Sequence, residues 1–257
     1  MKSSAPHHLP EVNFSDHGDI RYLHLGTEWV QGSMRLDDPF SIHLEYVQRM
    51  MAWLLFVDPA TVARRHAMQL GLGAASLTKF CHRKLRMKTT AIELNPQVVA
   101  ACRLWFRLPR DDSRLSVVLG DAAEVVAHEH WRGQVDALQV DLYDHEAAAP
   151  VLDSQEFYAD CRRLLTEDGC MTVNLFGRSS SYERSLDRIC AVFGEQPAAI
   201  GVELLAVQHR RRGAHQVLPP QAAHEDHGDR AQPAGDRRLP AVVQAAARRQ
   251  PVVGGAG

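Results

Sequence analysis

The chain has 257 residues, 45% of them hydrophobic, and a formal net charge of −2 at pH 7. This length suits one domain or one domain with a small appendage, and the near-neutral charge gives no reason to expect nucleic acid or an anionic membrane as a partner. The five cysteines form no Cys-x-x-Cys pair, which disfavours a disulfide framework and suits a reducing cytoplasm. No apolar run approaches the ~20 residues of a membrane span, and the polar N-terminus lacks the apolar segment of a secretion signal.

The N-terminal part of the chain divides into two regions that differ in composition and in residue pattern. Residues 1–18 are polar, and we expect them to form a flexible leader. Residues 19–60 are expected to form a β-hairpin and helix region. Its hairpin is predicted over Ile20–Leu25 and Glu28–Met34, and apolar residues at helical spacing predict one helix over Leu44–Phe56.

Strands and helices are expected to alternate through residues 61–196. Short apolar runs bounded by turn residues predict the strands, and amphipathic segments between them predict the helices. The predicted strands are His66–Leu70, Lys88–Ile92, Leu115–Val118, Val135–Val140 and Cys170–Phe176. The predicted helices are Ala75–Lys84, Pro96–Phe106, Ala122–His130, Ser154–Leu165 and Tyr182–Phe193. This alternation predicts an α/β fold, a doubly wound, Rossmann-like and mostly parallel sheet behind the small N-terminal hairpin.

Residues 197–257 differ in kind from the rest of the chain. They contain no Phe, Tyr or Trp and no clear strand or helix period, and Arg, Ala, Pro, Gln, His, Val and Gly dominate them. One interpretation is a disordered low-complexity tail. The other is a segment translated out of frame after about residue 196, which the other two reading frames of the gene would reveal.

A glycine turn follows the first predicted strand of the central domain. Gly71 and Gly73 are two residues apart, and Ser76 stands where the dinucleotide fingerprint has its third glycine. Glycines at such a turn let a ligand approach the backbone, and the helix behind it offers free N–H groups. Taken alone, the turn is compatible with a nucleotide site or with a purely structural connection. The absence of a Walker lysine disfavours a phosphate-binding loop.

Acidic residues follow the next three predicted strands. Glu93 is placed to accept the hydroxyls of a ribose, Asp121 with Ala122 to meet an adenine amino group, and Asp141 to face the same crevice. Each acid alone is as readily a helix cap or a solvated loop residue. The ordered set favours a nucleoside held without phosphates, and adenosine with a sulfonium arm fits it better than NAD or ATP.

Over about residues 20–195 these motifs resemble the spermidine synthase family, the polyamine aminopropyltransferases. Gln31 in GTEWVQGSMRL matches a nucleoside-contacting glutamine of the family, and His43 matches the histidine of its substrate element. The glycine loop matches the family's loop, and AIELNP and GDA match its ribose and adenine acids. VDLYD, with Asp141 and Asp144, matches its Asp-x-x-Asp pair.

The resemblance implies the reaction and the roles of these residues. The family moves an aminopropyl group from decarboxylated S-adenosylmethionine to an amine such as putrescine. Asp141 would deprotonate the attacking amine, Asp144 would hold the amine, and Gln31 and His43 would complete the substrate site. The resemblance implies a small-molecule amine as partner, no prosthetic group and no metal, and we expect a cytoplasmic homodimer.

Departures from the family pattern keep two alternatives open. Ala74 stands where the family has an acid for the donor's propylamine, and Ile42 and Leu44 stand where it has a tyrosine and a glutamate. The first alternative is a methyltransferase that uses S-adenosylmethionine on the same fold. The second is a catalytically weak nucleoside-binding paralogue.

Overall fold

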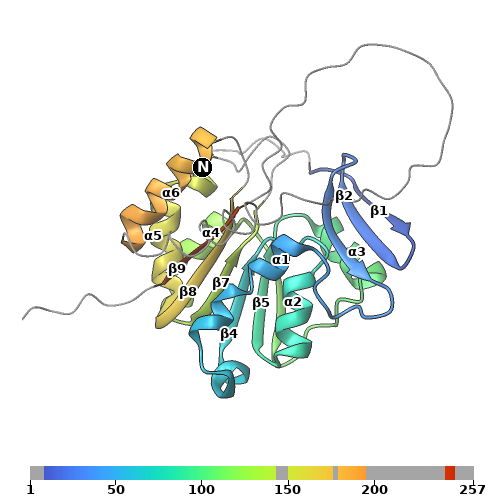
Figure 1. The fold of residues 1–257 in the computed structure, drawn as a ribbon, viewed down its shortest axis with the longest axis horizontal. Helices are drawn as coiled ribbons and strands as arrows, with labels where there is room; N and C mark the ends of the chain where they lie inside the picture. The colour runs from blue at the N-terminus through green and yellow to red at the C-terminus, as the bar shows by residue number, and fades with distance from the viewer. Residues whose placement is uncertain (1–8, 143–149, 176–178, 195–240, 247–257) are drawn as a thin grey trace, which may run out of the picture.

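A computed structural model describes residues 9–142, 150–175, 179–194 and 241–246 of the chain. These residues form a three-stranded antiparallel sheet at the N-terminal side and a six-stranded sheet flanked by helices (Figure 1). The predicted residue Asp144 and most of residues 197–257 lie outside the described residues.

The N-terminal sheet has one strand more than the sequence predicted. It comprises β1 (Val12–His17), β2 (Ile20–Leu25) and β3 (Val30–Arg35), paired antiparallel in that order. We expected a flexible leader up to residue 18, but β1 pairs with β2 along its whole length. The ring of Phe14 explains the difference, because it packs against Trp105 with ring centroids 5.2 Å apart and ties this mostly exposed strand to the central domain.

The helix predicted over Leu44–Phe56 is broken in the structure. It forms α1 (Glu45–Arg49) and then a 3-10 turn, η1 (Ala52–Phe56), before a second 3-10 turn, η2 (Pro59–Arg64). The break lies at Met50 and Met51, where the chain turns to bury Trp53. The Met50 carbonyl accepts hydrogen bonds from sheet side chains there, so the α-helical ladder does not continue.

The central sheet has the predicted α/β architecture. Its strands run in the order β6-β5-β4-β7-β8-β9, all parallel except β9, which pairs antiparallel with β8. The strands are β4 (His66–Leu70), β5 (Lys88–Glu93), β6 (Leu115–Leu119), β7 (Val135–Val140), β8 (Leu165–Leu175) and β9 (Ala241–Ala246). The doubly wound, Rossmann-like fold predicted from the alternation is therefore confirmed. The edge strand β9 comes from the compositionally unusual tail.

Helices cover both faces of this sheet (Figure 1). The α-helices are α2 (Ser76–Lys79), α3 (Pro96–Trp105), α4 (Ala122–Ala127), α5 (Gln155–Leu164) and α6 (Ser179–Phe193). The short elements are the π-helical turn η3 (Phe80–Lys84) and the 3-10 turns η4 (Glu129–Trp131) and η5 (Pro150–Asp153). Among the described helices, none is both long and apolar enough to cross a membrane.

Side chains alternate between the two faces of each strand, and the core is therefore divided into two sides. Met68 and Leu138 belong to the hydrophobic cluster formed with α4, α5 and α6. Their neighbours Ala67 and Ala137 belong to the cluster under α1, η1 and α2. Alternate side chains of a strand point to opposite faces of the sheet, so the odd-numbered positions of β4 and β7 face α1. This alternation decides which side chains face α1 at the ends of the strands.

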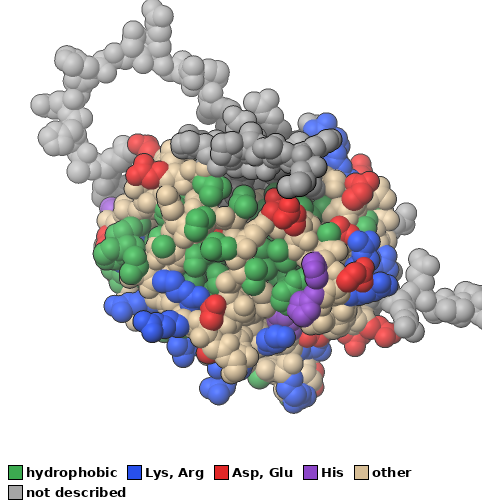
Figure 2. All heavy atoms as spheres, turned by 180° about the vertical axis from the view of Figure 1, so that it is seen from behind, with side chains coloured by type: hydrophobic (Ala, Val, Ile, Leu, Met, Phe, Trp, Pro, Cys, Tyr) green, Lys and Arg blue, Asp and Glu red, His purple; other side chains and the backbone are tan. Residues whose placement is uncertain are grey.

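The surface opposite to the view of Figure 1 has mixed character. Hydrophobic side chains gather in the middle of this face, and basic and acidic side chains both lie around it (Figure 2). The most exposed large apolar side chains among the described residues are Leu55, Leu104 and Trp29. Isolated apolar side chains of this kind are normal on a protein surface.

Candidate functional site

The candidate site lies where the strand order of the central sheet reverses. The chain runs outward from β4 to β5 and β6, then returns to β7 on the other side of β4. Open α/β sheets bind their ligands in the crevice beyond the carboxyl ends of the strands at such a switch point. Gly71, after β4, and Asp141, after β7, meet here, and the Asp141 N–H donates to the Leu70 carbonyl at 2.9 Å.

The glycine turn requires glycine at this junction. Gly71 has a φ of +87°, and a Cβ atom placed on it would lie 2.2 Å from the Asp141 carbonyl oxygen. Gly73 has a φ of +49°, and a Cβ there would lie 3.1 Å from the Gln31 carbonyl oxygen. L-residues with a Cβ rarely adopt these conformations, so the two glycines set the path of the loop. The predicted residues Gly71, Gly73 and Gln31 therefore come together, with Gln31 against the loop through its backbone.

Strand β3 packs directly on the glycine loop. A Cβ atom on Gly32 would lie 2.7 Å from the Cβ atom of Ala74, and the Ser76 hydroxyl donates to the Ser33 carbonyl at 2.9 Å. Ala74 is only 2% exposed as a result. The position where the family pattern has an acid is filled by the backbone of β3, so a longer side chain has no room there.

Glu93 clamps the glycine loop through its carboxylate. The Leu72 N–H donates to Oε2 at 2.9 Å and the Asn95 N–H donates to Oε1 at 2.8 Å. Burial raises the pKa of the Glu93 carboxyl, and the backbone hydrogen bonds oppose that rise. The carboxylate thus has a fixed place at the end of β5, and a carboxylate with its four lone-pair sites can accept further donors.

Asp121 and Ala122 begin α4 beside Glu93. The Asp121 side chain is exposed and caps the helix by accepting the Ala123 N–H at 2.7 Å, while Ala122 is buried. Two exposed apolar side chains border these acids, namely Leu94 with 51% exposure and Leu119 with 55%. Neither leucine was predicted as a site residue, although each adjoins a predicted motif in the sequence. They offer apolar surface of the kind a flat base packs against.

Asp141 is held by two neutral side chains from distant parts of the chain. The Asn174 side-chain amide donates to Oδ1 at 2.8 Å, and the Tyr46 hydroxyl donates to Oδ2 at 3.4 Å. Burial raises the pKa of the Asp141 carboxyl, and these two hydrogen bonds lower it. Burial and the Asp141 charge together raise the pKa of the Tyr46 phenol, so the phenol stays a neutral donor.

Tyr46 and Asn174 were both missed in the sequence. Tyr46 lies three residues after the predicted His43, and Asn174 is a polar residue at the carboxyl end of an apolar strand. These two features are the only signals the sequence carried for them. The Asn174 Oδ1 atom, beside Asp141, is buried and has no hydrogen-bond partner among the described residues.

His43 contacts the N-terminal sheet. Its Nδ1 atom lies 3.0 Å from the Ser33 hydroxyl, and its ring centroid lies 6.4 Å from that of Tyr22. These contacts tie His43 to the N-terminal sheet, and its recorded hydrogen bonds do not reach Asp141. Its predicted role in binding substrate stays a prediction.

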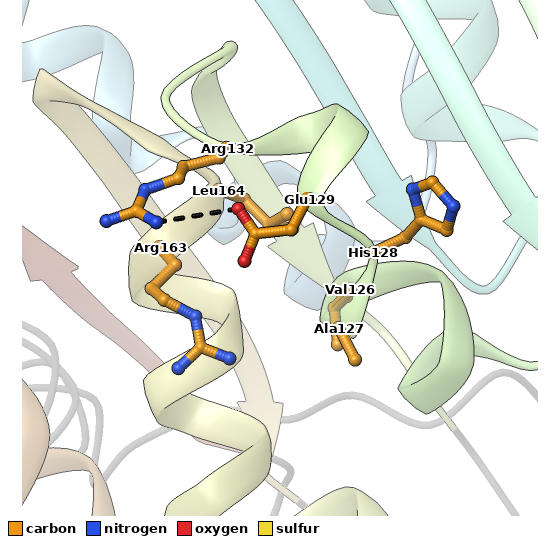
Figure 3. Close-up of a pocket in the computed structure, with 7 residues that line it drawn as sticks. All are labelled: Val126, Ala127, His128, Glu129, Arg132, Arg163 and Leu164. Atoms are coloured by element: carbon orange, nitrogen blue, oxygen red, sulfur yellow. Dashed lines mark hydrogen bonds and ion pairs between the residues drawn. The ribbon is translucent and has the colours of Figure 1, made fainter.

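A small surface pocket lies at the other end of the sheet. It has a volume of about 10 Å³ and is lined by Val126, Ala127, His128, Glu129, Arg132, Arg163 and Leu164. Glu129 and Arg132 point toward each other across it (Figure 3). Leu164 precedes the first residue of β8, so this pocket is at the amino ends of the strands and apart from the candidate site. The described residues contain no group of three His, Cys, Asp or Glu side chains arranged to hold a metal ion.

Comparisons with known proteins place the chain in one family. Residues 74–187 match the family model described as the spermine/spermidine synthase domain. The chain is 37% identical over 186 residues to a polyamine aminopropyltransferase of Neisseria meningitidis, covering 72% of this chain and 69% of the relative. It is 36% identical over 196 residues to a polyamine aminopropyltransferase of Chromobacterium violaceum, covering 74% of this chain and 73% of the relative.

A solved structure has the same fold. A probable spermidine synthase from Corynebacterium glutamicum superposes with a TM-score of 0.64 at 18% identity, covering 71% of this chain and 67% of that chain. The resemblance inferred from the sequence motifs is therefore confirmed. The matches to both curated relatives, together with the family model, show that this chain belongs to the spermine/spermidine synthase family, whose members are transferases.

Proposed function

We propose that this chain transfers the aminopropyl group of decarboxylated S-adenosylmethionine to a diamine such as putrescine, with Asp141 as the general base. The observation that carries the proposal is the placement of Asp141. A half-buried carboxylate stands at the switch point of the sheet and is held by two neutral donors, the Tyr46 hydroxyl and the Asn174 amide.

The chemistry requires a base because an alkyl ammonium is protonated at neutral pH, with a reference pKa of about 10.4 for lysine. The ammonium binds the Asp141 carboxylate and gives it a proton. The freed nitrogen lone pair forms a bond to the propyl carbon next to sulfur, and the carbon–sulfur bond breaks with its electron pair moving to sulfur. The products are methylthioadenosine and a secondary ammonium. Burial makes Asp141 a stronger base than an exposed aspartate, because it raises the pKa of the carboxyl.

The donor would lie across the ends of β4, β5 and β6. Glu93 would accept the ribose hydroxyls, Asp121 would accept the adenine amino group, and Leu94 and Leu119 would border the base. Gly71 and Gly73 would let the sulfonium arm approach the backbone. These positions are supported by the fixed Glu93 carboxylate and by the exposure of Asp121 and the two leucines.

Ala74 no longer argues for the methyltransferase alternative. Its side chain is buried against Gly32 in β3, so alanine in place of the family's acid does not open space at this position. We propose instead that the donor's amine is accommodated without an acid at this position. Asp144 as amine anchor, the homodimer and the cytoplasmic location stay predictions from the sequence.

Calorimetric titration followed by a turnover assay tests this function. The purified protein is titrated with S-adenosylmethionine, with its decarboxylated form and with methylthioadenosine, and is then assayed with putrescine. Preference for the decarboxylated donor and formation of methylthioadenosine in the presence of the amine are the expected results. Binding of the carboxylated donor alone would overturn the proposal, and binding without turnover would favour the nucleoside-binding alternative.

A further inference from the structure

Two rows of polar side chains lie on the face of β7 and β8 that α1 covers. Gln139 and Thr172 are register partners in the parallel pairing of these strands. Asp141 and Asn174 lie two residues further along the same strands and therefore on the same face. The row of Gln139 and Thr172 is fully buried, and the row of Asp141 and Asn174 reaches the candidate site.

The buried row holds the end of α1. The Met50 carbonyl accepts a hydrogen bond from the Thr172 hydroxyl at 3.1 Å and a longer one from the Gln139 amide at 3.4 Å. The Gln139 side-chain oxygen in turn accepts from the Gln69 amide at 2.7 Å, which fixes its orientation on the sheet. The last carbonyls of a helix lack partners within the helix, so side chains of the sheet satisfy Met50 here.

The same turn of α1 carries Tyr46. The Met50 N–H donates to the Tyr46 carbonyl at 3.0 Å, and the Tyr46 hydroxyl reaches Asp141 Oδ2 at 3.4 Å. Met50 is thus linked to Thr172 through its carbonyl and to Tyr46 through its N–H. Three consecutive hydrogen bonds connect the buried row of β7 and β8 to the carboxylate at the end of β7.

We propose that Thr172 and Gln139 are positioning residues that anchor α1 to the sheet and thereby hold the Tyr46 hydroxyl against Asp141. This inference rests on the proposed function, in which Asp141 is the base. A buried polar cluster can also act only in folding, so the test must separate positioning from stability.

The consequence is a change in the proton affinity of Asp141. Tyr46 is the titratable group that the described elements place against this carboxylate, and Asn174 is its neutral partner from β8. The hydrogen bonds from both lower the pKa of Asp141 against the effect of burial. Loosening α1 weakens the Tyr46 hydrogen bond and raises the pKa, so the acidic limb of the kcat profile moves to higher pH.

The experiment compares Thr172→Val with Thr90→Val as a matched control. Thr90 is equally buried on β5, and its hydroxyl contacts the buried His66, apart from α1 and the site. Both variants lose one buried hydroxyl and are expected to lose similar stability. Thr172→Val is expected to lose roughly fivefold in kcat, the effect of one neutral hydrogen bond, and to shift the acidic limb upward. Thr90→Val is expected to keep the wild-type kcat and the wild-type acidic limb. Thr172→Ser retains the hydroxyl and is expected to show wild-type values of both.

Combining Thr172→Val with Tyr46→Phe shows whether Thr172 acts through Tyr46 or independently of it. If Thr172 acts through Tyr46, then adding Thr172→Val to Tyr46→Phe changes kcat and the pH profile little further. Full additivity of the two substitutions, or an unchanged pH profile in Thr172→Val, overturns the proposal. Thr172→Ala serves the same comparison if the valine variant does not fold.

A second readout does not depend on activity. Carbon-13 NMR of aspartate-labelled protein, with the Asp141 signal assigned by Asp141→Asn, follows the titration of this carboxyl directly. Thr172→Val and Tyr46→Phe are both expected to raise its pKa, and Thr90→Val to leave it unchanged. An inactive wild-type protein would contradict the proposed function, whereas an Asp141 titration unmoved by Thr172→Val would contradict the positioning role.

Discussion

Glu93 and Asp141 are half-buried carboxylates at the ends of two strands, and they are held in different ways. Burial raises the pKa of both groups. Glu93 accepts two short hydrogen bonds from the backbone N–H groups of Leu72 and Asn95. Asp141 accepts its two recorded hydrogen bonds from the side chains of Tyr46 and Asn174, and the one from Tyr46 is long at 3.4 Å.

The difference indicates what each carboxylate is suited to do. Backbone donors keep Glu93 in place whatever the neighbouring side chains do, as suits a group that binds a fixed part of a ligand. Neutral side-chain donors leave Asp141 free to gain and lose a proton, and the weak Tyr46 contact leaves room for a stronger donor such as an ammonium. The comparison therefore supports the proposed roles, ligand binding for Glu93 and proton transfer for Asp141.

Asp141→Asn gives the largest expected effect. Asparagine cannot take the proton of the attacking ammonium, so kcat is expected to fall by about 10²–10⁴-fold, the usual contribution of a general base. Affinity for methylthioadenosine is expected to change little, because the proposed contacts to the nucleoside lie at the ends of the other strands. Steady-state assays with putrescine and calorimetry measure the two quantities.

A matched control for this variant lies on the same strand. Asp136→Asn removes a charge at the opposite end of β7, where the carboxylate accepts the His66 N–H at 2.8 Å. This variant is expected to keep the wild-type kcat. Equal losses of kcat in both variants would mean that Asp141 affects turnover only through the fold.

Glu93→Gln is expected to show the opposite pattern. Glutamine offers only one oxygen, so the N–H of Leu72 or of Asn95 loses its partner, and an unsatisfied buried donor costs about 1–3 kcal/mol. The amide NH₂ also replaces an acceptor for the proposed ribose hydroxyls, so the affinity for methylthioadenosine is expected to fall roughly 10- to 100-fold. Turnover at saturating donor is expected to fall far less than in Asp141→Asn. A large loss of kcat at unchanged affinity would erase the distinction between the two carboxylates.

The surroundings of Glu93 could be predicted from the sequence better than the surroundings of Asp141. Strand periodicity and two nearby glycines predict the loop, and an acid directly after a strand faces the crevice by topology alone. The partners of Asp141 come from 95 and 33 residues away. Finding them requires the register of β7 and β8 and the break after α1, neither of which local pattern specifies. The polar strand β1 was not predicted for a similar reason, because Phe14 packs on Trp105, which lies far along the chain.

Tyr46→Phe should shift the pH dependence of turnover with a moderate loss of rate. The Tyr46 hydrogen bond lowers the pKa of Asp141, so its removal raises that pKa further above the ordinary aspartate value of 3.8. The base must be ionised to act, and the acidic limb of kcat therefore moves to higher pH. A loss of roughly fivefold in kcat is expected on the plateau.

Tyr158→Phe is the control for the tyrosine variant. Tyr158 is buried, and its hydroxyl donates to Asp153 at 2.9 Å in the part of the core formed with α6. Its removal is expected to lower stability and leave the pH profile of kcat in place. A wild-type profile in Tyr46→Phe would show that the 3.4 Å contact has no influence on Asp141.

The smallest expected effect is a gain in stability from Asp141→Asn. The folded state raises the pKa of this carboxyl above its value in the unfolded chain, so ionising it costs folding free energy. The full cost applies at pH values above the pKa of Asp141 in the folded state. The cost disappears at pH values below its pKa in the unfolded chain. Asp141→Asn removes the cost, and its amide can still accept from the Asn174 amide with its oxygen and donate to the Tyr46 hydroxyl with its nitrogen. A rise in Tm of a few degrees is therefore expected at neutral pH, shrinking as the pH falls toward the ordinary aspartate range.

Thermal unfolding at a series of pH values measures this gain, with Asp121→Asn as the control. Asp121 is exposed and caps α4, and asparagine caps a helix equally well, so its replacement is expected to change Tm little. A lower Tm for Asp141→Asn at neutral pH would mean that the ionised carboxylate stabilises the fold through its donors. Asp141 would then resemble Glu93, and its assignment as the residue that exchanges a proton would lose its physical basis.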